Sequence, residues 1–268
     1  MRINTNLNAM IATNQMSKNT ALAGSSMEKL STGLRITKAG DDAAGLAVSE
    51  KMRAQIRGME QAERNVQDGI SMVQTAEGAL EEAGNIAQRM RELAVQAGND
   101  TLDTKDRTKV KKELEQLQDE MKKISEETKF NGKQLLNTAG TFTIQAGANS
   151  ETRKITTADL SSIASNLSST SISNATEAQN FVTKVDVALE SINAARSELG
   201  AMQNRLEYTA NNLTTSTENL TAAESRIRDV DVAKEMVTLS KLNILNQASQ
   251  AMVSQAKQQP ESVSQLLR

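Results

Sequence analysis

The sequence predicts a mainly α-helical protein, an elongated antiparallel bundle of long helices with terminal coiled-coil helices and one small β-hairpin. Apolar residues recur every three or four positions over very long segments, which is the spacing of a helix that packs along its whole length. The 268 residues include a single proline, Pro260, so little in the chain forces a helix to stop. There is no tryptophan, one tyrosine and three phenylalanines, so most apolar side chains are aliphatic ones that favour helices.

The longest periodic segment starts after Asp41 and Asp42 and ends before Gly98. The aspartates suit the N-terminal end of a helix, and the glycine suits its C-terminal end. Such a helix is roughly 80 Å long at ~1.5 Å per residue, which predicts a rod-like molecule. Four glycines inside it each cost about 1 kcal/mol relative to alanine, so we expect a neighbouring helix to approach closely there. These glycines are Gly58, Gly69, Gly78 and Gly84.

Two further helices complete the predicted bundle. One runs from about Thr104 to Glu127, with an apolar stripe on one side and charges of both signs elsewhere, which is typical of a solvent-facing helix. The other is a second long helix that starts near Thr176 and mirrors the first. Two long helices joined by a shorter one make an antiparallel bundle.

The helical pattern breaks between the shorter helix and the last long helix. Residues 130–132, Phe-Asn-Gly, are a turn signal. Residues 141–144 and 153–156 predict the two strands of a hairpin, with residues 146–150 as its loop. Residues 161–176 are rich in Ser, Thr and Asn, which predicts a surface loop. The region of about 138–175 is therefore expected to hold the hairpin and a Ser/Thr-rich surface segment.

The two ends of the chain carry few charges. Residues 1–27 include only Arg2 and Lys18, and the stretch from Val232 is similarly poor in charge. Apolar residues there cover more than one face of a helix, and such a helix must be buried on several sides. One neighbour from the same chain cannot cover every side, so other copies of the chain are the expected partners. The residues expected in these assembly contacts are Ile3, Leu7, Met10, Ile11, Met236, Leu239, Leu242, Leu245 and Met252.

These observations divide the chain into three segments. Residues 1–40 form the N-terminal part of an inner assembly domain plus a connector, residues 41–231 form the rod-like bundle, and residues 232–268 form the C-terminal part of the assembly domain. Because residues 1–35 and 232–268 have little core of their own, we expect them to be disordered in the free monomer.

Histidine and cysteine are absent from the chain. Their absence removes histidine acid–base chemistry, a cysteine nucleophile and nearly every transition-metal site. Asp41 and Asp42 suggest a catalytic carboxylate pair, but nothing else completes such a site, and helix capping explains both. The sequence predicts that the protein is not an enzyme and has no catalytic, cofactor-binding or metal-binding residue.

Charge and hydropathy argue against two further classes of partner. The net charge of −2 disfavours a dedicated nucleic-acid binder. No apolar run approaches the ~20 residues that cross a membrane, so we expect no membrane insertion. Residues 1–6 lack the apolar core of a signal peptide, so we expect any export to proceed without a cleaved signal peptide.

Two blocks near the N-terminus, residues 30–36 and 41–49, closely resemble the N-terminal signature of bacterial flagellins. Other segments resemble the same family in the same order, and the resemblance covers about residues 1–137 and 176–268. These segments are residues 3–6, 88–96, 130–132, 196–201, 203–206 and 225–231. The chain resembles a short flagellin, a flagellar filament subunit that lacks the large outer domains of many members.

This resemblance implies a function and a set of partners. In that family the paired termini line the inner tube of a filament, which self-assembles and acts as the propeller for swimming motility. The implied partners are other flagellin subunits in a homopolymer, an export chaperone with the flagellar secretion apparatus, and the filament cap and hook-junction proteins. The implied location is extracellular, in the filament of the bacterial flagellum.

Three residues resemble the positions through which an animal innate immune receptor binds flagellins. These are Arg89, Leu93 and Glu113. Arg89 and Leu93 lie four residues apart and so share one face of a helix. The resemblance implies a receptor contact on that face, and a charged bundle surface without a receptor role is the alternative.

Two other functions fit part of the sequence. A hook–filament junction protein shares the terminal helices, although the short, uninterrupted signature disfavours it. A soluble coiled-coil adaptor explains the periodicity but leaves the charge-poor ends unexplained. Some flagellins carry an inserted metallopeptidase, but that domain needs a His-Glu-x-x-His run, and this chain has no histidine.

Overall fold

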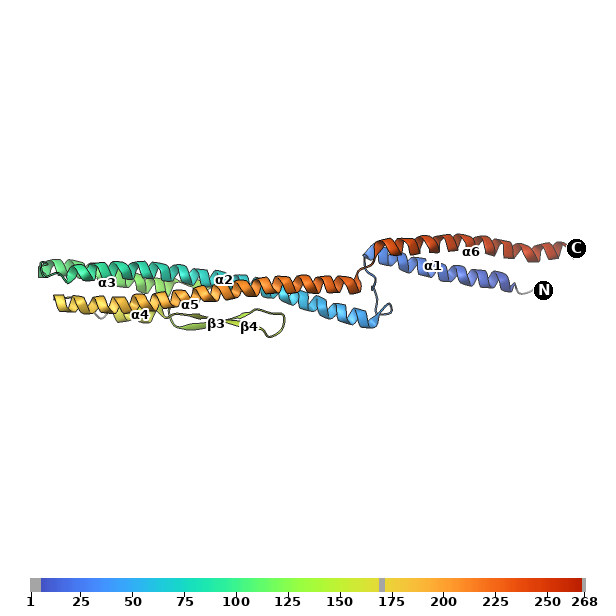
Figure 1. The fold of residues 1–268 in the computed structure, drawn as a ribbon. Coiled ribbons are helices and arrows are strands. Elements are labelled where there is room, and N and C mark those ends of the chain that lie inside the picture. Colours follow the sequence, from blue (N-terminus) through green and yellow to red (C-terminus); the bar gives the residue numbers. More distant parts are fainter. Residues whose placement is uncertain (1–5, 169–171, 267–268) are drawn as a thin grey trace. The chain divides into compact units, whose positions relative to one another are not determined.

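The computed structural model describes residues 6–168 and 172–266, with side chains described as far as residue 258. The elements in chain order are α1 (Leu7–Thr32), α2 (Ala43–Ala97), α3 (Thr104–Glu127), β1 (Lys129–Phe130), β2 (Lys133–Gln134), β3 (Gly140–Gln145), β4 (Thr152–Thr157), α4 (Leu160–Ser168), α5 (Ala175–Arg228) and α6 (Val232–Leu266) (Figure 1). This confirms the prediction of a mainly helical chain built on very long helices.

The chain separates into two compact units. The first contains Met1–Ala54 with Asn219–Arg268, and the second contains Gln55–Glu218. The division falls inside α2 and α5, because each of these helices contributes to both units.

In the second unit, α2 and α5 pack antiparallel along one continuous apolar stripe. Val73, Leu80 and Met90 of α2 are completely buried, as are the alanines that lie between them at steps of three or four residues. Ion pairs flank this stripe, with Arg91 Nε 2.7 Å from Asp186 Oδ1 and Arg196 Nη2 3.8 Å from Glu81 Oε2. The predicted antiparallel packing of the two long helices is therefore confirmed within this unit.

Helix α3 adds a third layer to the second unit, and its apolar stripe is buried while its charged sides are exposed. Val110, Leu114 and Met121 are buried, as the sequence predicts. Asp103 caps the helix N-terminus, because its side chain accepts a hydrogen bond from the backbone N–H of Thr104. The helix spans the predicted residues, Thr104–Glu127.

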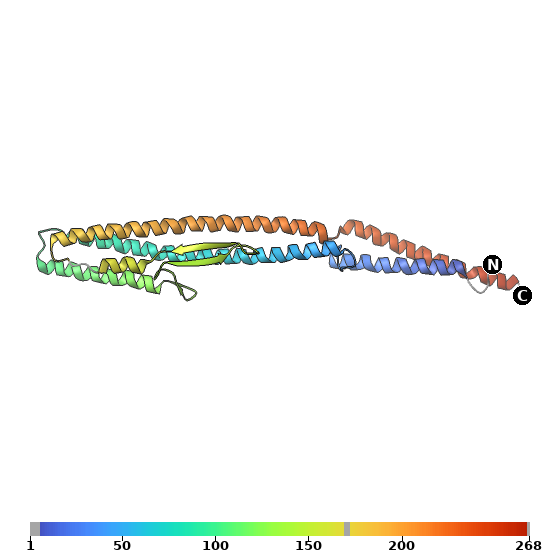
Figure 2. The same ribbon diagram turned by 90° about the horizontal axis from the view of Figure 1, so that it is seen from below.

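The predicted hairpin is present as β3 and β4, which pair antiparallel from Gly140↔Thr157 to Gln145↔Thr152. The side-chain amide of Asn65 on α2 donates to the backbone carbonyl of Gln145 at 3.2 Å, so the hairpin docks on α2 (Figure 2). Ile155 of β4 is completely buried. The hairpin is therefore a packed part of the second unit.

The hairpin, rather than a neighbouring helix, explains two of the four α2 glycines at which a close neighbour was expected. A Cβ atom at Gly58 would lie 2.8 Å from the Cβ atom of Ala148 in the hairpin loop, and one at Gly69 would lie 3.3 Å from Cγ1 of Ile144. At Gly84 the neighbour is Ile192 of α5, at 3.8 Å, which is an ordinary helix contact. At Gly78 nothing lies within 4 Å, so the expectation of a close neighbour was wrong there.

The prediction of a loop over residues 161–176 was wrong for much of that segment. Residues 160–168 form α4, which packs against α3, and Gln118 Nε2 donates to the backbone carbonyl of Leu167 at 2.8 Å. Leu160, Ala164 and Leu167 are buried at helical spacing, and this short stripe outweighs the polar composition. Residues 169–171 of the predicted loop lie outside the described residues.

A second small strand pair surrounds the predicted Phe-Asn-Gly turn. Strands β1 and β2 pair antiparallel, with Phe130 opposite Lys133. Asn131 and Gly132 both have positive φ, 49° and 78°, as a tight two-residue hairpin turn requires. The sequence identified the turn but not the short strands on either side of it.

The glycines of α2 give a matched test of the hairpin contact. We expect Gly78→Ala to raise the free energy of unfolding by roughly 0.8–1 kcal/mol, because a solvent-facing helix position gains helix propensity. Gly58→Ala gains the same propensity but forces Ala148 away, so it should be less stable than Gly78→Ala by about 1 kcal/mol or more. Urea unfolding of both variants measures this difference, and equal stabilisation would show that the hairpin does not constrain α2.

Candidate assembly interface

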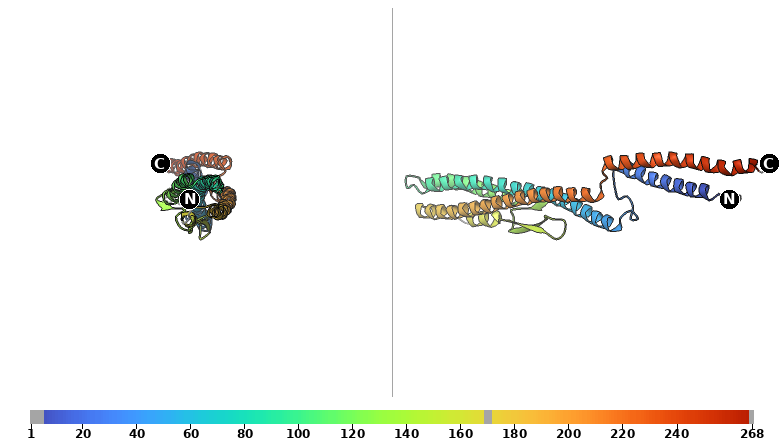
Figure 3. Two further views of the ribbon diagram at one scale, coloured as in Figure 1. Left: turned by 90° about the vertical axis from the view of Figure 1, so that its left-hand side faces the viewer. Right: turned by 45° about the vertical axis from the view of Figure 1, so that its right-hand side comes forward.

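The first unit contains an antiparallel pair formed by the terminal helices α1 and α6 (Figure 3). Asn6 caps α1, because its Oδ1 accepts from the backbone N–H of Ala9, and its Nδ2 donates to the backbone carbonyl of Ala256 at 2.6 Å. At the C-terminal end of α1, Gly33 has a φ of 71°, the left-handed conformation that ends many helices. In the described residues both ends form capped helices that contact each other, and the disorder expected in the free monomer stays a prediction.

The pair buries few of its own apolar side chains. In the described part of α1 the buried residues are Asn19 and Ser26, and in that of α6 they are Leu242 and Ala256. Many large apolar side chains of both helices are instead exposed to solvent. They are Leu7, Met10, Ile11, Leu22, Met27, Val232, Met236, Val237, Ile244, Leu245 and Met252. Within one chain, each helix thus covers only a small part of the other.

The structure exposes most of the residues that the sequence predicts for assembly contacts. Six are exposed, one is half-buried and one is buried, and Ile3 lies outside the described residues. The exposed ones are Leu7, Met10, Ile11, Met236, Leu245 and Met252. Leu239 is half-buried. Leu242 is only 8% exposed, so it belongs to the contact between α1 and α6 and is already covered inside the monomer.

Sequence reasoning left out Leu22 and Met27, whose exposed fractions are 56% and 61%. Both lie on α1, C-terminal to the α1 residues that the sequence predicts for assembly contacts. The sequence does contain a signal for Leu22 and Met27, because both are large apolar residues in a helix that carries few charges.

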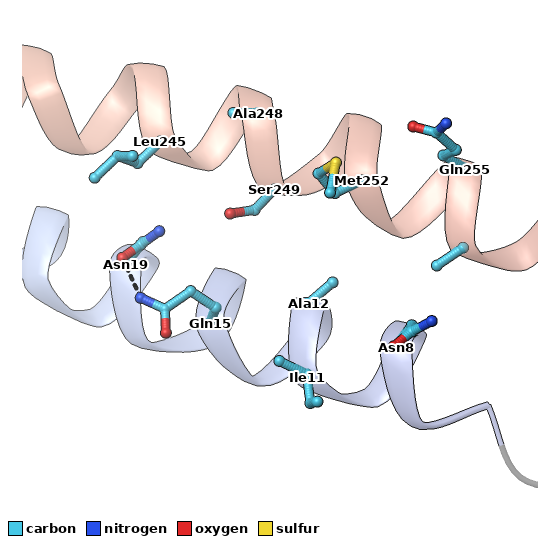
Figure 4. Close-up of a pocket in the computed structure, with 11 residues that line it drawn as sticks. Asn8, Ile11, Ala12, Gln15, Asn19, Leu245, Ala248, Ser249, Met252 and Gln255 are labelled. Carbon is cyan, nitrogen blue, oxygen red and sulfur yellow. Dashed lines mark hydrogen bonds between the residues drawn. The ribbon is translucent and has the colours of Figure 1, made fainter.

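A groove of about 600 Å³ lies between the two terminal helices (Figure 4). Ile11 and Ala12 of α1 and Leu245 and Met252 of α6 contribute apolar walls. Polar side chains from both helices line the same groove, among them Asn19. The groove shows that α1 and α6 do not interdigitate closely over this stretch.

The two segments that lead into the terminal helices are bound to each other. The backbone N–H of Arg35 donates to the carbonyl of Arg228 at 2.7 Å, and that of Val230 donates to the carbonyl of Gly33 at 3.0 Å. Leu34 and Asp229 form an isolated antiparallel bridge between these bonds. We call residues 33–36 and 227–230 the connector clasp.

Asp41 and Asp42 act in local structure, as the sequence predicts, but only one of them caps α2. The Oδ1 atom of Asp42 accepts from the backbone N–H of Gly45 at 2.9 Å, which is an N-terminal cap. Asp41 closes the preceding turn, because its Oδ2 atom accepts from the backbone N–H groups of Thr37 and Lys38, each at 3.1 Å, and from the Thr37 hydroxyl at 3.0 Å. Hydrogen bonds from the backbone of Lys38 and Thr37 hold the pKa of Asp41 below its ordinary value.

The predicted receptor residues lie in the second unit and separate into two groups. Arg89 Nη2 lies 3.0 Å from Glu113 Oε1, and Arg89 Nη1 lies 2.9 Å from Glu92 Oε2, so these exposed side chains form one cluster across α2 and α3. The bonds to Glu92 and Glu113 raise the pKa of Arg89, which is charged at any physiological pH. Leu93 is only 2% exposed, which corrects the expectation that it shares an accessible face with Arg89.

Clusters that could hold a metal ion are not found among residues 6–168 and 172–266. In the same described ranges, no helix combines the length and the hydropathy needed to span a membrane.

Long antiparallel helices, with a terminal pair whose apolar sides are largely uncovered, define a structural protein built for self-assembly. Comparison with known proteins identifies the family. The family model described as "Bacterial flagellin N-terminal helical region" matches residues 3–141. The one described as "Bacterial flagellin C-terminal helical region" matches residues 182–267. A flagellin of Halalkalibacterium halodurans is 54% identical over 272 residues, with 100% of both chains covered. The chain belongs to the bacterial flagellin family.

Other relatives and solved structures agree with this assignment. A flagellin of Bacillus subtilis is 47% identical over 309 residues, again with 100% of both chains covered. The crystal structure of Bacillus cereus flagellin is 34% identical with a TM-score of 0.51, covering 60% of this chain and 94% of that one. A putative flagellar hook-associated protein from Vibrio parahaemolyticus, 12% identical with a TM-score of 0.60 and covering 70% of this chain and 100% of that one, shares the fold alone.

These findings establish the function at the level of the family. The chain is a flagellar filament subunit, a structural protein that assembles with further copies into the filament used for cell motility. The short form that the sequence predicts agrees with the full-length coverage of the Halalkalibacterium halodurans relative.

The Asp41 turn gives a prediction for acid conditions. Because its folded pKa lies below the ordinary value of about 3.9, the turn contributes stability above that pH and loses it as the pH falls through the lowered pKa. We expect Thr37→Val, which removes one hydroxyl donor, to move the pKa of Asp41 back toward its ordinary value. Titration followed by NMR at the Asp41 carboxyl carbon measures this, with Thr13→Val as a control on an unrelated hydroxyl. An unchanged pKa in Thr37→Val would show that the hydroxyl does not stabilise the carboxylate.

Proposed function

We propose that the filament forms through α1 and α6, whose exposed apolar side chains become buried against those of neighbouring copies. The observation that carries this proposal is the set of large apolar side chains that the pair leaves uncovered, with Ile11 65% and Met252 60% exposed. A large exposed apolar surface on a soluble chain marks an interaction site. On this proposal residues 1–40 and 232–268 act together as the inner assembly domain, and residues 41–231 act as the rod-like domain.

Charge supports other copies of the chain as the occupant. Residues 1–27 carry two charged side chains, Arg2 and Lys18, so little electrostatic repulsion opposes the packing of identical helices. Burial of side chains such as Leu7 and Met10 contributes roughly 1.5–3 kcal/mol for each one fully covered. Repeated at every subunit, these contacts hold a long polymer together. We propose no catalytic role for the chain.

A charge introduced at Leu245 tests whether this residue contributes to filament assembly or to the folding of the monomer. Leu245 is 40% exposed in the monomer, whereas Leu80 is completely buried in the bundle. We expect Leu245→Asp to shift the monomer melting temperature little and to reduce filament yield at least about tenfold, because a buried unpaired charge costs several kcal/mol. Leu80→Asp should instead destabilise the monomer by several kcal/mol.

Thermal melting followed by circular dichroism and filament yield after sedimentation test this prediction. Leu245→Met is the matched control, and it should assemble like the unaltered chain because it retains apolar bulk. Equal loss of monomer stability in Leu245→Asp and Leu80→Asp would mean that α6 belongs to the monomer core and would overturn the proposed division of roles.

We further propose that an export chaperone covers α6 before the chain leaves the cell through the flagellar secretion apparatus. The support is the exposed apolar surface of Met236, Val237 and Ile244, which suits a hydrophobic groove in a partner. The resulting location is extracellular, in the filament, where cap and hook-junction proteins contact the same polymer.

Deletion of residues 232–268 should abolish capture of the flagellar chaperone in a pull-down, because the deletion removes the whole of α6. A matched deletion of residues 1–27 should retain the capture. Chaperone binding to the chain that lacks residues 232–268 would place the binding site elsewhere.

The exposed cluster of Arg89, Glu92 and Glu113 is our proposed contact for an animal innate immune receptor. Its side chains lie on α2 and α3, so one partner surface can contact both helices. Leu93, which is buried, would act by holding α2 in place beneath this cluster.

A further inference from the structure

The methionines whose side chains the structure describes fall into two main groups by position. Those that are more than half exposed lie on the terminal helices α1 and α6. They are Met10, Met27, Met236 and Met252. Those that are buried lie in the second unit. They are Met59, Met72, Met90, Met121 and Met202. Met16 and Met52 are half-buried.

Methionine is the side chain of this protein that an oxidant attacks most readily, because the chain contains no cysteine and no tryptophan. A hydroperoxide reacts with a thioether by two-electron oxygen transfer. A lone pair of the sulfur attacks the outer peroxide oxygen, the O–O bond breaks and an S–O bond forms. The departing oxygen takes the proton of the transferred oxygen and leaves as water or an alcohol. The sulfur is oxidised, the peroxide is reduced, and no third reactant is needed.

Exposure decides which of these thioethers a hydroperoxide reaches. The buried methionines of the second unit are protected by packing along α2, α3 and α5, since an oxidant must reach the sulfur to react with it. The exposed methionines of α1 and α6 have no such cover within their own chain. Limited oxidation of the monomer therefore modifies the terminal helices first.

The exposed methionines lie among the apolar side chains that the proposed assembly uses. Met10 lies between Leu7 and Ile11 in the sequence, and all three are exposed. Met252 lines the groove between α1 and α6 together with Leu245 (Figure 4). Oxidation converts a flexible apolar thioether into a polar sulfoxide, which disrupts interfaces that contain methionine. A polar group at these places opposes the apolar burial of the proposed assembly.

We propose that the exposed methionines of α1 and α6 are sites of modification by hydroperoxides, and that their oxidation to the sulfoxide blocks assembly while the helical bundle stays folded. The block on assembly rests on the proposed function, whereas the selectivity of the oxidation is a property of the single chain. The bundle stays folded because its methionines are buried and remain thioethers. Methionine sulfoxide reductases reverse the reaction, so the modification is a reversible switch.

Hydrogen peroxide applied to dilute monomer tests the selectivity. The reaction is stopped with catalase at successive times, and each sulfoxide is quantified by mass spectrometry of proteolytic peptides. We expect the exposed methionines of α1 and α6 to oxidise at least about tenfold faster than the buried methionines of the second unit. Similar rates in the two groups would overturn the assignment of the modification sites.

Substitution by leucine tests the effect on assembly, because leucine is apolar, similar in size and inert to peroxide. The exposed-set variant combines Met10→Leu, Met27→Leu, Met236→Leu and Met252→Leu. The matched control combines Met16→Leu with Met52→Leu, which makes the same change at half-buried positions. Filament yield after peroxide is divided by the yield of the same chain without peroxide, so any effect of the substitutions themselves cancels.

We expect this ratio to fall at least about tenfold in the unaltered chain and in the control, and to stay near one in the exposed-set variant. Thermal melting followed by circular dichroism should show an intact bundle in every oxidised sample. Sulfoxide reductases that accept both epimers should restore the yield of the unaltered chain. An unchanged ratio in the unaltered chain overturns the proposal, as does an equal fall in the exposed-set variant or loss of the bundle on oxidation.

The proposed assembly function is tested without peroxide, by the filament yields of the unaltered chain and of Leu245→Asp. The sulfoxide map of the monomer does not depend on assembly. Failure of one proposal is therefore distinguishable from failure of the other.

Discussion

Burial of one apolar stripe along α2 is the interaction on which the second unit depends. Val73, Leu80 and Met90 lose all contact with solvent, and the alanines between them allow close approach of the neighbouring helices. A helix of 55 residues cannot be stabilised by its own hydrogen bonds and propensity alone, so packing along its length decides whether it forms. The hairpin, α3 and α5 each add to that packing. The polar side chains of these elements lie mainly on the outside.

The terminal helices follow a different physical rule, since their own chain cannot cover them. Many of their large apolar side chains are exposed in the single chain, and on the proposed function these side chains are buried by other copies. The proposed function thus assigns folding to the bundle and association to the terminal helices. The exposed apolar side chains of α1 and α6 are the observation behind the proposed site of association.

The sequence predicted the long helices and the hairpin because their signals repeat over many residues. Its errors lie where two signals compete within a few residues. Phe181 and Val182 are adjacent and both apolar, and helical spacing alone does not decide between them, whereas the structure buries Phe181 completely and leaves Val182 half-buried. In α4, the three buried apolar residues lie among four serines and one asparagine and did not stand out from that polar composition. The burial of Leu93 and Leu242 could not be predicted either, because it depends on which neighbours the fold supplies.

The connector clasp has a mechanical consequence. Its two backbone hydrogen bonds and its bridge link residues 33–36 to residues 227–230, so the chain is doubled where it leaves each terminal helix. Because these bonds couple the two connectors, a force on either terminal helix is transmitted to both of them. A pulling force on the connectors therefore acts on two hydrogen-bonded backbone segments and not on a single one. This arrangement suits a subunit of a fibre that rotates in a viscous medium.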